Sequence, residues 1–292
     1  MSSRDAEERS IVSAADLRRT PVRIGLAVSI LAGLVLAAIA GLGPLLWLAK
    51  AAVSTTEDTV TRPLALWPSG VQWHNVADAW TSIGIGRSTL NTILIAAGTM
   101  VTSIIVSTTG GYVLAVLRPR WAPVLQGLIL ATLFVPGTIT LVPLYLTVKQ
   151  LGFTGNYLGV WLPAAASAFN VLIVKQFFDR IPAELYEAAR IDGAGSFGVF
   201  IWILLPMARP ILGVVLMLTF IASWKDFLWP LLVLTKPETQ PLSVALFKIS
   251  LTAEKSLLLA GMFCTVVIPL VLFLIFQRQF LRSAGAAGAV KG

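Results

Sequence analysis

Six long apolar runs constrain this chain more than any other feature of its sequence. Each is close to the roughly 20 residues that a helix needs to cross a hydrocarbon core about 30 Å thick. They occupy residues 24–48, 90–117, 124–148, 157–178, 211–234 and 257–276. The runs predict an all-α membrane protein with six transmembrane helices. Pro136 and Pro143 are expected to break the third run.

The overall composition excludes a soluble protein. Of the 292 residues, 57% are hydrophobic and only 12% are charged, whereas a soluble domain carries about 25% charged residues. The stretch from Met1 to Arg23 is polar and mixed in charge, so we do not expect a cleavable signal peptide. The net charge of +8 does not indicate nucleic-acid binding, because the basic residues lie between the apolar runs.

The basic residues between the runs predict the orientation of the chain. If the N-terminus is cytoplasmic, that side receives 14 of them and the other side 7. Lys and Arg favour the cytoplasmic side, so both termini are predicted to be cytoplasmic. The cytoplasmic set is Arg4, Arg9, Arg18, Arg19, Arg23, Arg118, Arg120, Lys175, Arg180, Arg190, Arg209, Arg278, Arg282 and Lys291; the external set is Lys50, Arg62, Arg87, Lys149, Lys236, Lys248 and Lys255.

Two external loops are long enough to carry structure of their own. They cover residues 51–86 and 235–256. The second contains Pro237 and Pro241, and we expect an ordered hairpin-like or short helical loop there.

The large cytoplasmic segment between the fourth and fifth runs has the pattern of a helix, a sharp turn and a second helix. Pro182 suits the first turn of a helix. Glu184 near its start and Arg190 near its end complement the helix dipole. Asp192-Gly193 is a turn signal, because glycine adopts the left-handed conformation that ends a helix. A second helix is expected from about Ser196.

This segment resembles the EAA loop of the membrane subunits of ABC importers. The family pattern is EAA, then Asp-Gly-Ala, an aromatic residue, and Leu-Pro followed by a second proline. The matching residues are Glu187, Ala188, Ala189, Asp192, Gly193, Ala194, Phe200, Ile203, Leu205, Pro206 and Pro210. The alternative is an amphipathic interfacial helix that has no partner.

Further motifs extend the resemblance to the carbohydrate-uptake branch of these subunits, and within it to the MalG type. They are Leu141-Val142-Pro143-Leu144, Asn156-Tyr157, Leu162-Pro163, Phe177-Phe178, Ile181-Pro182, Trp224-Lys225-Asp226-Phe227, Trp229-Pro230-Leu231 and Gly288-Ala289-Val290-Lys291-Gly292. The chain departs from the family at Trp202, where many relatives have a basic residue, and at Lys225, where relatives often have asparagine.

The resemblance implies a type I importer permease (MetI-like) fold and a domain organisation. Residues 1–23 would form a cytoplasmic segment, 24–282 the transmembrane domain with its EAA loop at 179–210, and 283–292 a cytoplasmic tail. The tail would reach between the ATPase subunits. The protein would be a multi-pass permease of the bacterial cytoplasmic (inner) membrane that imports a sugar or oligosaccharide.

The same resemblance implies the partners. The helix around Glu187 would be a coupling helix, seated in a cleft of one subunit of an ABC ATPase dimer. The residues assigned to this coupling are Glu187, Ala188, Ala189, Asp192, Gly193, Ala194, Leu205 and Pro206. Further partners would be a second, MalF-like permease, membrane lipid, and an extracytoplasmic substrate-binding protein that contacts the loop at 235–256; nucleic acid would not be one.

We predict no catalysis and no cofactor in this chain. It contains no GxxxxGK[ST] phosphate loop, so ATP and Mg would be bound by the partner ATPase. The lone Cys264 and the lone His74 supply neither a disulfide nor a metal cluster.

Four residues within the apolar runs are candidates for the wall of the translocation path: Asn170, Trp224, Lys225 and Asp226. Each has an alternative role. Asn170 could make an interhelical hydrogen bond, and Trp224, like Trp229, could anchor the chain at the membrane interface. Lys225 and Asp226 could form an internal salt bridge, or the fifth span could end before them, because a charge inside a span is unfavourable.

Two other functions compete with the importer subunit. A secondary transporter coupled to an ion gradient would need several buried carboxylates and inverted repeats, and only Asp226 qualifies. An intramembrane enzyme would need paired aspartates, a Ser–His pair or a metal motif within the spans, and we find none in the sequence. The resemblance of residues 179–210 to an EAA loop implies that an ATPase powers transport. It carries no information on which sugar is transported.

Overall fold

The computed structural model describes residues 19–288, and throughout this range the regular elements are helices, with no strand. Arg4, Arg9, Arg18, Lys291 and the last four residues of the predicted tail lie outside the described residues. The predicted all-α architecture is confirmed for the described part of the chain.

Three of the described helices are each long and apolar enough to cross a membrane. They are α2 (Thr20–Ala52), α5 (Ile85–Tyr112), which continues as the π-helix η2 (Val113–Leu117), and α16 (Lys255–Gly288). Three bent helix pairs pass the same test when each is taken together, which gives up to six spans in the described range.

The third run contains a sharp break where the sequence predicts a membrane span. Helix α6 (Ala122–Thr132) and helix α7 (Gly137–Gln150) meet at 110°. Pro136 lies immediately before α7. The break occurs here because the proline ring fixes the backbone and proline lacks the N–H that would continue α6. Pro143, which was also predicted to break the run, instead lies inside α7.

The fourth run is bent less strongly. Helix α8 (Leu158–Ala165) and helix α9 (Ala168–Phe178) meet at 45°. The new helix begins at Ser167, whose side chain accepts a hydrogen bond from the Asn170 N–H and so caps α9.

The predicted fifth span is wrong in its extent. Helix α13 (Arg209–Lys225) ends at Lys225, Asp226 is extended, and the chain resumes as the short helix α14 (Leu228–Val233). Asp226 has φ −67° and ψ 129°, which interrupts the helix, and its carbonyl accepts a hydrogen bond from the Ser243 hydroxyl (2.9 Å). Helix α13 is long and apolar enough to cross a membrane only when it is taken together with the preceding segment, Ser196–Met207, which meets it at 75°.

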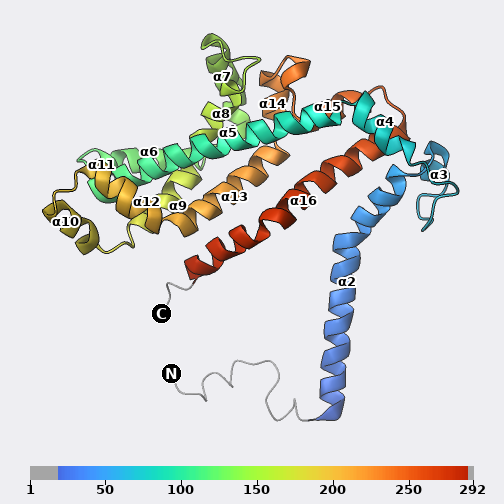
Figure 1. Cartoon of the computed structure of the whole chain (residues 1–292), viewed down its shortest axis with the longest axis horizontal. Coiled ribbons are helices and arrows are strands. Elements are labelled where there is room, and N and C mark those ends of the chain that lie inside the picture. Colours follow the sequence, from blue (N-terminus) through green and yellow to red (C-terminus); the bar gives the residue numbers. More distant parts are fainter. Residues whose placement is uncertain (1–18, 289–292) are drawn as a thin grey trace.

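Helix α5 is the central element of the packed body (Figure 1). Helices α8, α9 and α13 pack against it, and α16 packs against α13. Gly98 makes the approach of α8 possible, since a Cβ placed there would lie 2.0 Å from Cε2 of Trp161. Helix α2 joins the body near its own C-terminal end and splays away from it elsewhere, and none of its apolar window is buried within the chain.

The two ends of α5 carry different structures. One end carries α10 (Ala183–Ile191) and the other carries α3 (Thr56–Thr61), α4 (His74–Ser82) and α15 (Leu242–Ser250) (Figure 1). Asn91 Nδ2 donates to the carbonyls of Glu238 (2.8 Å) and Gln240 (2.9 Å), next to the 3₁₀ turn η4 (Pro237–Thr239). The loop at 235–256 is therefore ordered and partly helical, as its sequence predicts.

Candidate functional site

The predicted coupling segment forms a short helix that lies on the outside of the molecule. Helix α10 follows Pro182, has Glu184 in its first turn and Arg190 in its last, and contains no buried residue. The Arg190 guanidinium carbon lies 6.0 Å from the centre of the Tyr186 ring. Both charges complement the helix dipole, as the sequence indicated.

The helix ends in the turn that Asp192-Gly193 predicts. Gly193 has φ +86°, the left-handed region that favours glycine. The Gly193 N–H donates to the Arg190 carbonyl (3.1 Å) and the Ala194 N–H to the Ala189 carbonyl (2.9 Å). These two bonds make a Schellman motif, which satisfies carbonyls at the helix end and fixes the direction of the following chain.

The second part of the segment runs from Ser196 to Met207 as α11 (Ser196–Gly198), η3 (Val199–Leu204) and α12 (Leu205–Met207). Val199 and Leu204 are fully buried in a cluster that also includes Phe178 and Val215. This cluster joins the segment to the membrane helices α9 and α13.

Tyr112 connects this segment directly to α5. Its hydroxyl donates to the Ser196 carbonyl (2.8 Å), and its ring centre lies 5.0 Å from that of Phe200. A displacement of the segment would therefore be passed to the end of the central helix.

The predicted coupling residues separate into two groups. Glu187, Ala188, Asp192, Gly193 and Pro206 are exposed, whereas Ala189, Ala194 and Leu205 are half-buried and pack against the cluster. The two alanines, Ala188 and Ala189, therefore do not share one open face. Positions one residue apart on a helix point about 100° apart, so one alanine faces outward and the other inward.

An ion network that sequence reasoning missed lies where the segment begins. Asp179 pairs with Lys175 (2.7 Å) and with Arg118 (3.1 Å). The Lys175–Asp179 spacing of four residues on a helix is a signal that could have found half of it. Arg118 directly follows η2, which continues α5. Its ion pair with Asp179 joins residues far apart in sequence and therefore depends on the fold.

A buried polar cluster joins the three central helices. Asn170 Nδ2 on α9 donates to Ser103 Oγ on α5 (3.0 Å) and to Thr219 Oγ1 on α13 (3.2 Å). Asn170 is only 6% exposed. It therefore makes the interhelical hydrogen bonds that were the alternative to a place on the translocation path.

Beside this cluster lies a hollow of about 550 Å³, here called the polar hollow. Two helix breaks meet there, the one between α8 and α9 and the end of α13. Its lining residues are Thr99, Val160, Ala164, Ser167, Phe169, Asn170, Leu218, Thr219, Ala222, Ser223, Lys225 and Asp226.

Three of the four residues predicted for the translocation path line the polar hollow: Asn170, Lys225 and Asp226. Among the side chains that the structure describes, no ion pair joins Lys225 or Asp226 to another residue. The internal salt bridge offered as an alternative is therefore absent from the described side chains, and α13 ends at Lys225, which leaves Asp226 outside the helix.

Trp224 does not line the hollow; its ring centre lies 5.6 Å from that of Phe220. Trp229 is held from within, because its Nε1 donates to the Gly159 carbonyl (3.0 Å). Neither ring lines the hollow as a platform for a sugar.

Thr99 and Ser223 are polar-hollow residues that sequence reasoning missed. The hydroxyl of each is buried without a hydrogen-bond partner in the described structure. A signal for the first was present, since buried polar residues recur along one side of α5 at Ser88, Thr92, Thr99, Ser103 and Ser107. Within residues 19–288, no group of three His, Cys, Asp or Glu side chains could hold a metal ion.

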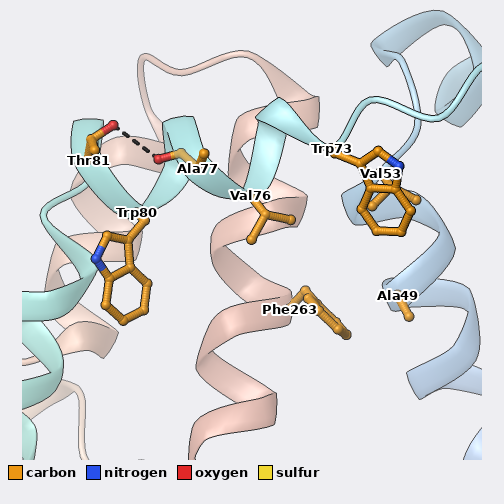
Figure 2. Close-up of a pocket in the computed structure, with 8 residues that line it drawn as sticks. All are labelled: Ala49, Val53, Trp73, Val76, Ala77, Trp80, Thr81 and Phe263. Carbon is orange, nitrogen blue, oxygen red and sulfur yellow. Dashed lines mark hydrogen bonds between the residues drawn. The ribbon is translucent and has the colours of Figure 1, made fainter.

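A second hollow, of about 800 Å³, lies at the other end of the body between α2, α4 and α16. Figure 2 shows Trp73, Trp80 and Phe263 among its lining side chains. Its walls are apolar, and tryptophan is enriched where membrane meets water. This hollow is suited to hydrocarbon rather than to a polar solute.

Comparison with known proteins identifies similar chains. A protein-family model described as "Binding-protein-dependent transport system inner membrane component" matches residues 107–283. The probable ABC transporter permease protein YurM of Bacillus subtilis is 32% identical over 255 residues, which cover 85% of this chain and 83% of that protein. The sn-glycerol-3-phosphate transport system permease protein UgpE of Yersinia pestis is 31% identical over 250 residues, covering 81% and 88%.

Another relative is the diacetylchitobiose uptake system permease protein NgcG of Streptomyces coelicolor, 29% identical over 246 residues that cover 82% of this chain and 81% of that protein. Among solved structures, a chain of a bacterial ABC transporter involved in the import of the acidic polysaccharide alginate aligns with a TM-score of 0.78. It is 24% identical, and the alignment covers 89% of this chain and 98% of that chain. This likeness shows that the fold is shared.

Proposed function

Because the chain belongs to the family of binding-protein-dependent transport system inner membrane components, we propose that it is a permease subunit of an ATP-driven importer of a carbohydrate. The observation that carries the proposal is the exposed α10 with its Schellman turn, joined through Tyr112 to the central helix of the bundle. Family membership favours this function over an ion-coupled transporter and over an intramembrane enzyme. The relative named for diacetylchitobiose uptake supports a small carbohydrate as the substrate.

The first part of the proposal is that α10 docks onto an ATPase subunit. Glu187 and Ala188 are exposed, and Ile191 is 87% exposed. An exposed apolar side chain beside a carboxylate, on a helix with no buried residue, is typical of a surface that another protein covers. Glu187 would pair with a basic group of the ATPase, and ATP and Mg would be bound and hydrolysed there, with no cofactor in this chain.

In the mechanism that follows, closure of the ATPase dimer moves α10 with it. The Gly193 turn passes the movement to the segment from Ser196 to Met207. The packed cluster and the Tyr112 hydroxyl then pass it to α5, α9 and α13, whose packed arrangement can switch between two states. The pathway would thereby turn from inward- to outward-facing.

The second part of the proposal is the topology. We propose six spans with both termini in the cytoplasm of a bacterial inner membrane. The three long helices and three bent pairs support the number of spans, and the excess of basic residues on the α10 side supports the orientation. With this topology we propose the domain boundaries that the sequence suggested, 1–23, 24–282 and 283–292.

The third part concerns partners within and outside the membrane. None of the apolar window of α2 is buried, and Ile139, Val142 and Leu146 of α7 are at least half exposed. A second permease that covers α2 and α7, with lipid around the remainder, would account for the exposed apolar side chains of both helices. The ordered external loop around α15 would contact the substrate-binding protein.

Co-purification tests the proposed function. A tagged chain extracted in mild detergent from its native membrane should bring down an ABC ATPase and a second permease, identified by mass spectrometry. The matched control is Gly193→Pro, which should still bring down the second permease but lose the ATPase. Isolation of wild-type chain alone, still active in transport, would contradict the proposal.

A further inference from the structure

The polar hollow contains two hydroxyl groups that lack the partner such groups normally have within a helix. Thr92, Thr102 and Thr109, on the same helix as Thr99, each donate to the carbonyl four residues earlier. The Thr99 hydroxyl makes no hydrogen bond in the described structure although Thr99 is only 4% exposed. The Ser223 hydroxyl on α13 is likewise buried and unpaired.

Unpaired buried hydroxyls are unfavourable, and more so inside a membrane, where little water is available. Both line the same hollow, from opposite helices. The hollow also receives two broken helices, and irregular backbone at membrane depth is tolerated where it lines a polar cavity. These observations indicate a polar occupant.

The charges of the hollow narrow the class of that occupant. Lys225 offers only hydrogen-bond donors and Asp226 carboxylate only acceptors, and they are the two charged residues among the described lining. Their charges sum to zero. A neutral polyhydroxylated molecule can use both, because each sugar hydroxyl donates and accepts, whereas the charged group of an anionic sugar could pair only with Lys225 and would be repelled by Asp226.

The remaining walls and the volume suit one sugar unit. Phe169 is 52% exposed and Leu218 is 41% exposed, and both line the hollow. Such apolar groups pack against the C–H faces of a sugar ring. The volume of about 550 Å³ lies within the range of about 300–1,000 Å³ that is typical of ligand sites.

We propose that the polar hollow is a binding subsite for a neutral sugar unit in transit, in which Thr99, Ser223, Lys225 and Asp226 hydrogen-bond its hydroxyls. The inference rests on the proposed function and deepens it. It assigns sugar contacts to this chain itself, and it favours neutral over anionic sugars as the cargo.

Uptake by whole cells tests the subsite. Cells lacking the chain receive tagged wild type or a variant and are given radiolabelled lactose, diacetylchitobiose, arabinotriose or sn-glycerol 3-phosphate. Wild type should take up at least one of the three neutral sugars. For that sugar, Thr99→Val and Ser223→Ala should each lower the initial rate about three- to tenfold, the effect of one lost hydrogen bond.

The control is Thr109→Val, which removes an exposed hydroxyl from the same helix that is bonded within the helix, and should transport as wild type does. Ser223→Thr keeps a hydroxyl and should restore uptake. Asp226→Asn should lower uptake of the neutral sugar and raise the relative uptake of sn-glycerol 3-phosphate. Immunoblots of the membrane fraction correct each rate for the amount of chain.

Two results would overturn the subsite alone. They are equal rates for Thr99→Val, Ser223→Ala and Thr109→Val, or wild-type uptake of sn-glycerol 3-phosphate and of none of the neutral sugars. In both cases the wild-type chain still transports. Uptake of none of the four compounds, with no ATPase in the co-purified material, would instead overturn the proposed function.

Discussion

The loop that contains α10 and its Gly193 turn, here called the α10 loop, differs from the polar hollow in almost every physical respect. The loop is exposed, and its shape is fixed by local backbone geometry, above all by φ +86° at Gly193. The hollow is assembled by four helices and by polar groups that are as far apart in sequence as Thr99 and Asp226. A change in the loop should therefore disturb transport without disturbing the fold. A change around the hollow should affect stability, substrate handling or both.

The largest effect is expected from Gly193→Pro. Proline fixes φ near −65°, so it is incompatible with the left-handed turn that Gly193 makes at φ +86°. Transport should fall to background while the chain still inserts and keeps its helical content by circular dichroism. Gly195→Ala is the matched control, since Gly195 has φ −68° and nothing lies within 4 Å of a Cβ placed there. Normal uptake by Gly193→Pro would show that transport does not need the left-handed turn at Gly193.

Gly98→Ala should act in the opposite way, through stability. A Cβ at this position would lie 2.0 Å from Trp161 Cε2, and overpacking of this kind costs about 1–3 kcal/mol. The thermal midpoint of the purified chain should fall. Gly127→Ala on α6 is the control, because nothing lies within 4 Å of a Cβ there. Equal midpoints for both variants would show that α8 does not pack on α5 as described.

Asn170→Ala should have a smaller effect on stability. It removes the hydrogen bonds to Ser103 and Thr219, and such bonds in membrane bundles contribute about 0.6 kcal/mol each on average. Unfolding in mixed detergent should reveal the loss. A double-mutant cycle with Ser103→Ala should give a coupling energy, since the two side chains are in contact. Additive effects would contradict the cluster.

The smallest effect is expected in the external loop, where one carboxylate holds two segments together. Asp58 Oδ2 accepts hydrogen bonds from the Ser69 N–H (2.9 Å) and hydroxyl (2.7 Å). These bonds hold the pKa of the Asp58 carboxyl below its ordinary value. The stabilisation is therefore fully present above the ordinary Asp pKa of about 3.9, and it is lost as the pH falls through the lowered pKa.

Asp58→Asn should accordingly lower the thermal midpoint slightly at pH 7, and the difference from wild type should shrink as the pH approaches 3. Glu57→Gln is the control, because Glu57 is the exposed neighbouring acid. A difference between Asp58→Asn and wild type that stays constant from pH 7 to pH 3 would show that the carboxylate does not hold the loop.

The two regions also differ in how far sequence could predict them. The structure of the α10 loop could be predicted because each of its features is local: Pro182 starts the helix, Asp192-Gly193 ends it, and the spacing of the EAA pattern is short. What the sequence missed is the inward orientation of Ala189, which depends on the cluster beneath it.

Only some residues of the polar hollow could be predicted from the sequence. Lys225, Asp226 and Asn170 stand out because they are polar within apolar runs. Thr99 and Ser223 do not, since a hydroxyl in a membrane helix usually bonds its own backbone, and their lack of a partner is visible only in three dimensions. The end of the fifth span was only one of two alternatives from the sequence, because the charges of Lys225 and Asp226 could equally have formed a salt bridge within a longer helix.

The central claim is that α10 couples ATP hydrolysis to transport, and Glu187→Ala tests it most directly. The complete transporter is reconstituted in liposomes with its sugar-loaded binding protein, and ATP hydrolysis and sugar uptake are measured together. Glu184→Ala is the control, being an exposed carboxylate on the same helix. We predict that Glu187→Ala loses both sugar-stimulated hydrolysis and uptake while Glu184→Ala keeps both; wild-type values for Glu187→Ala in both measurements would contradict the claim.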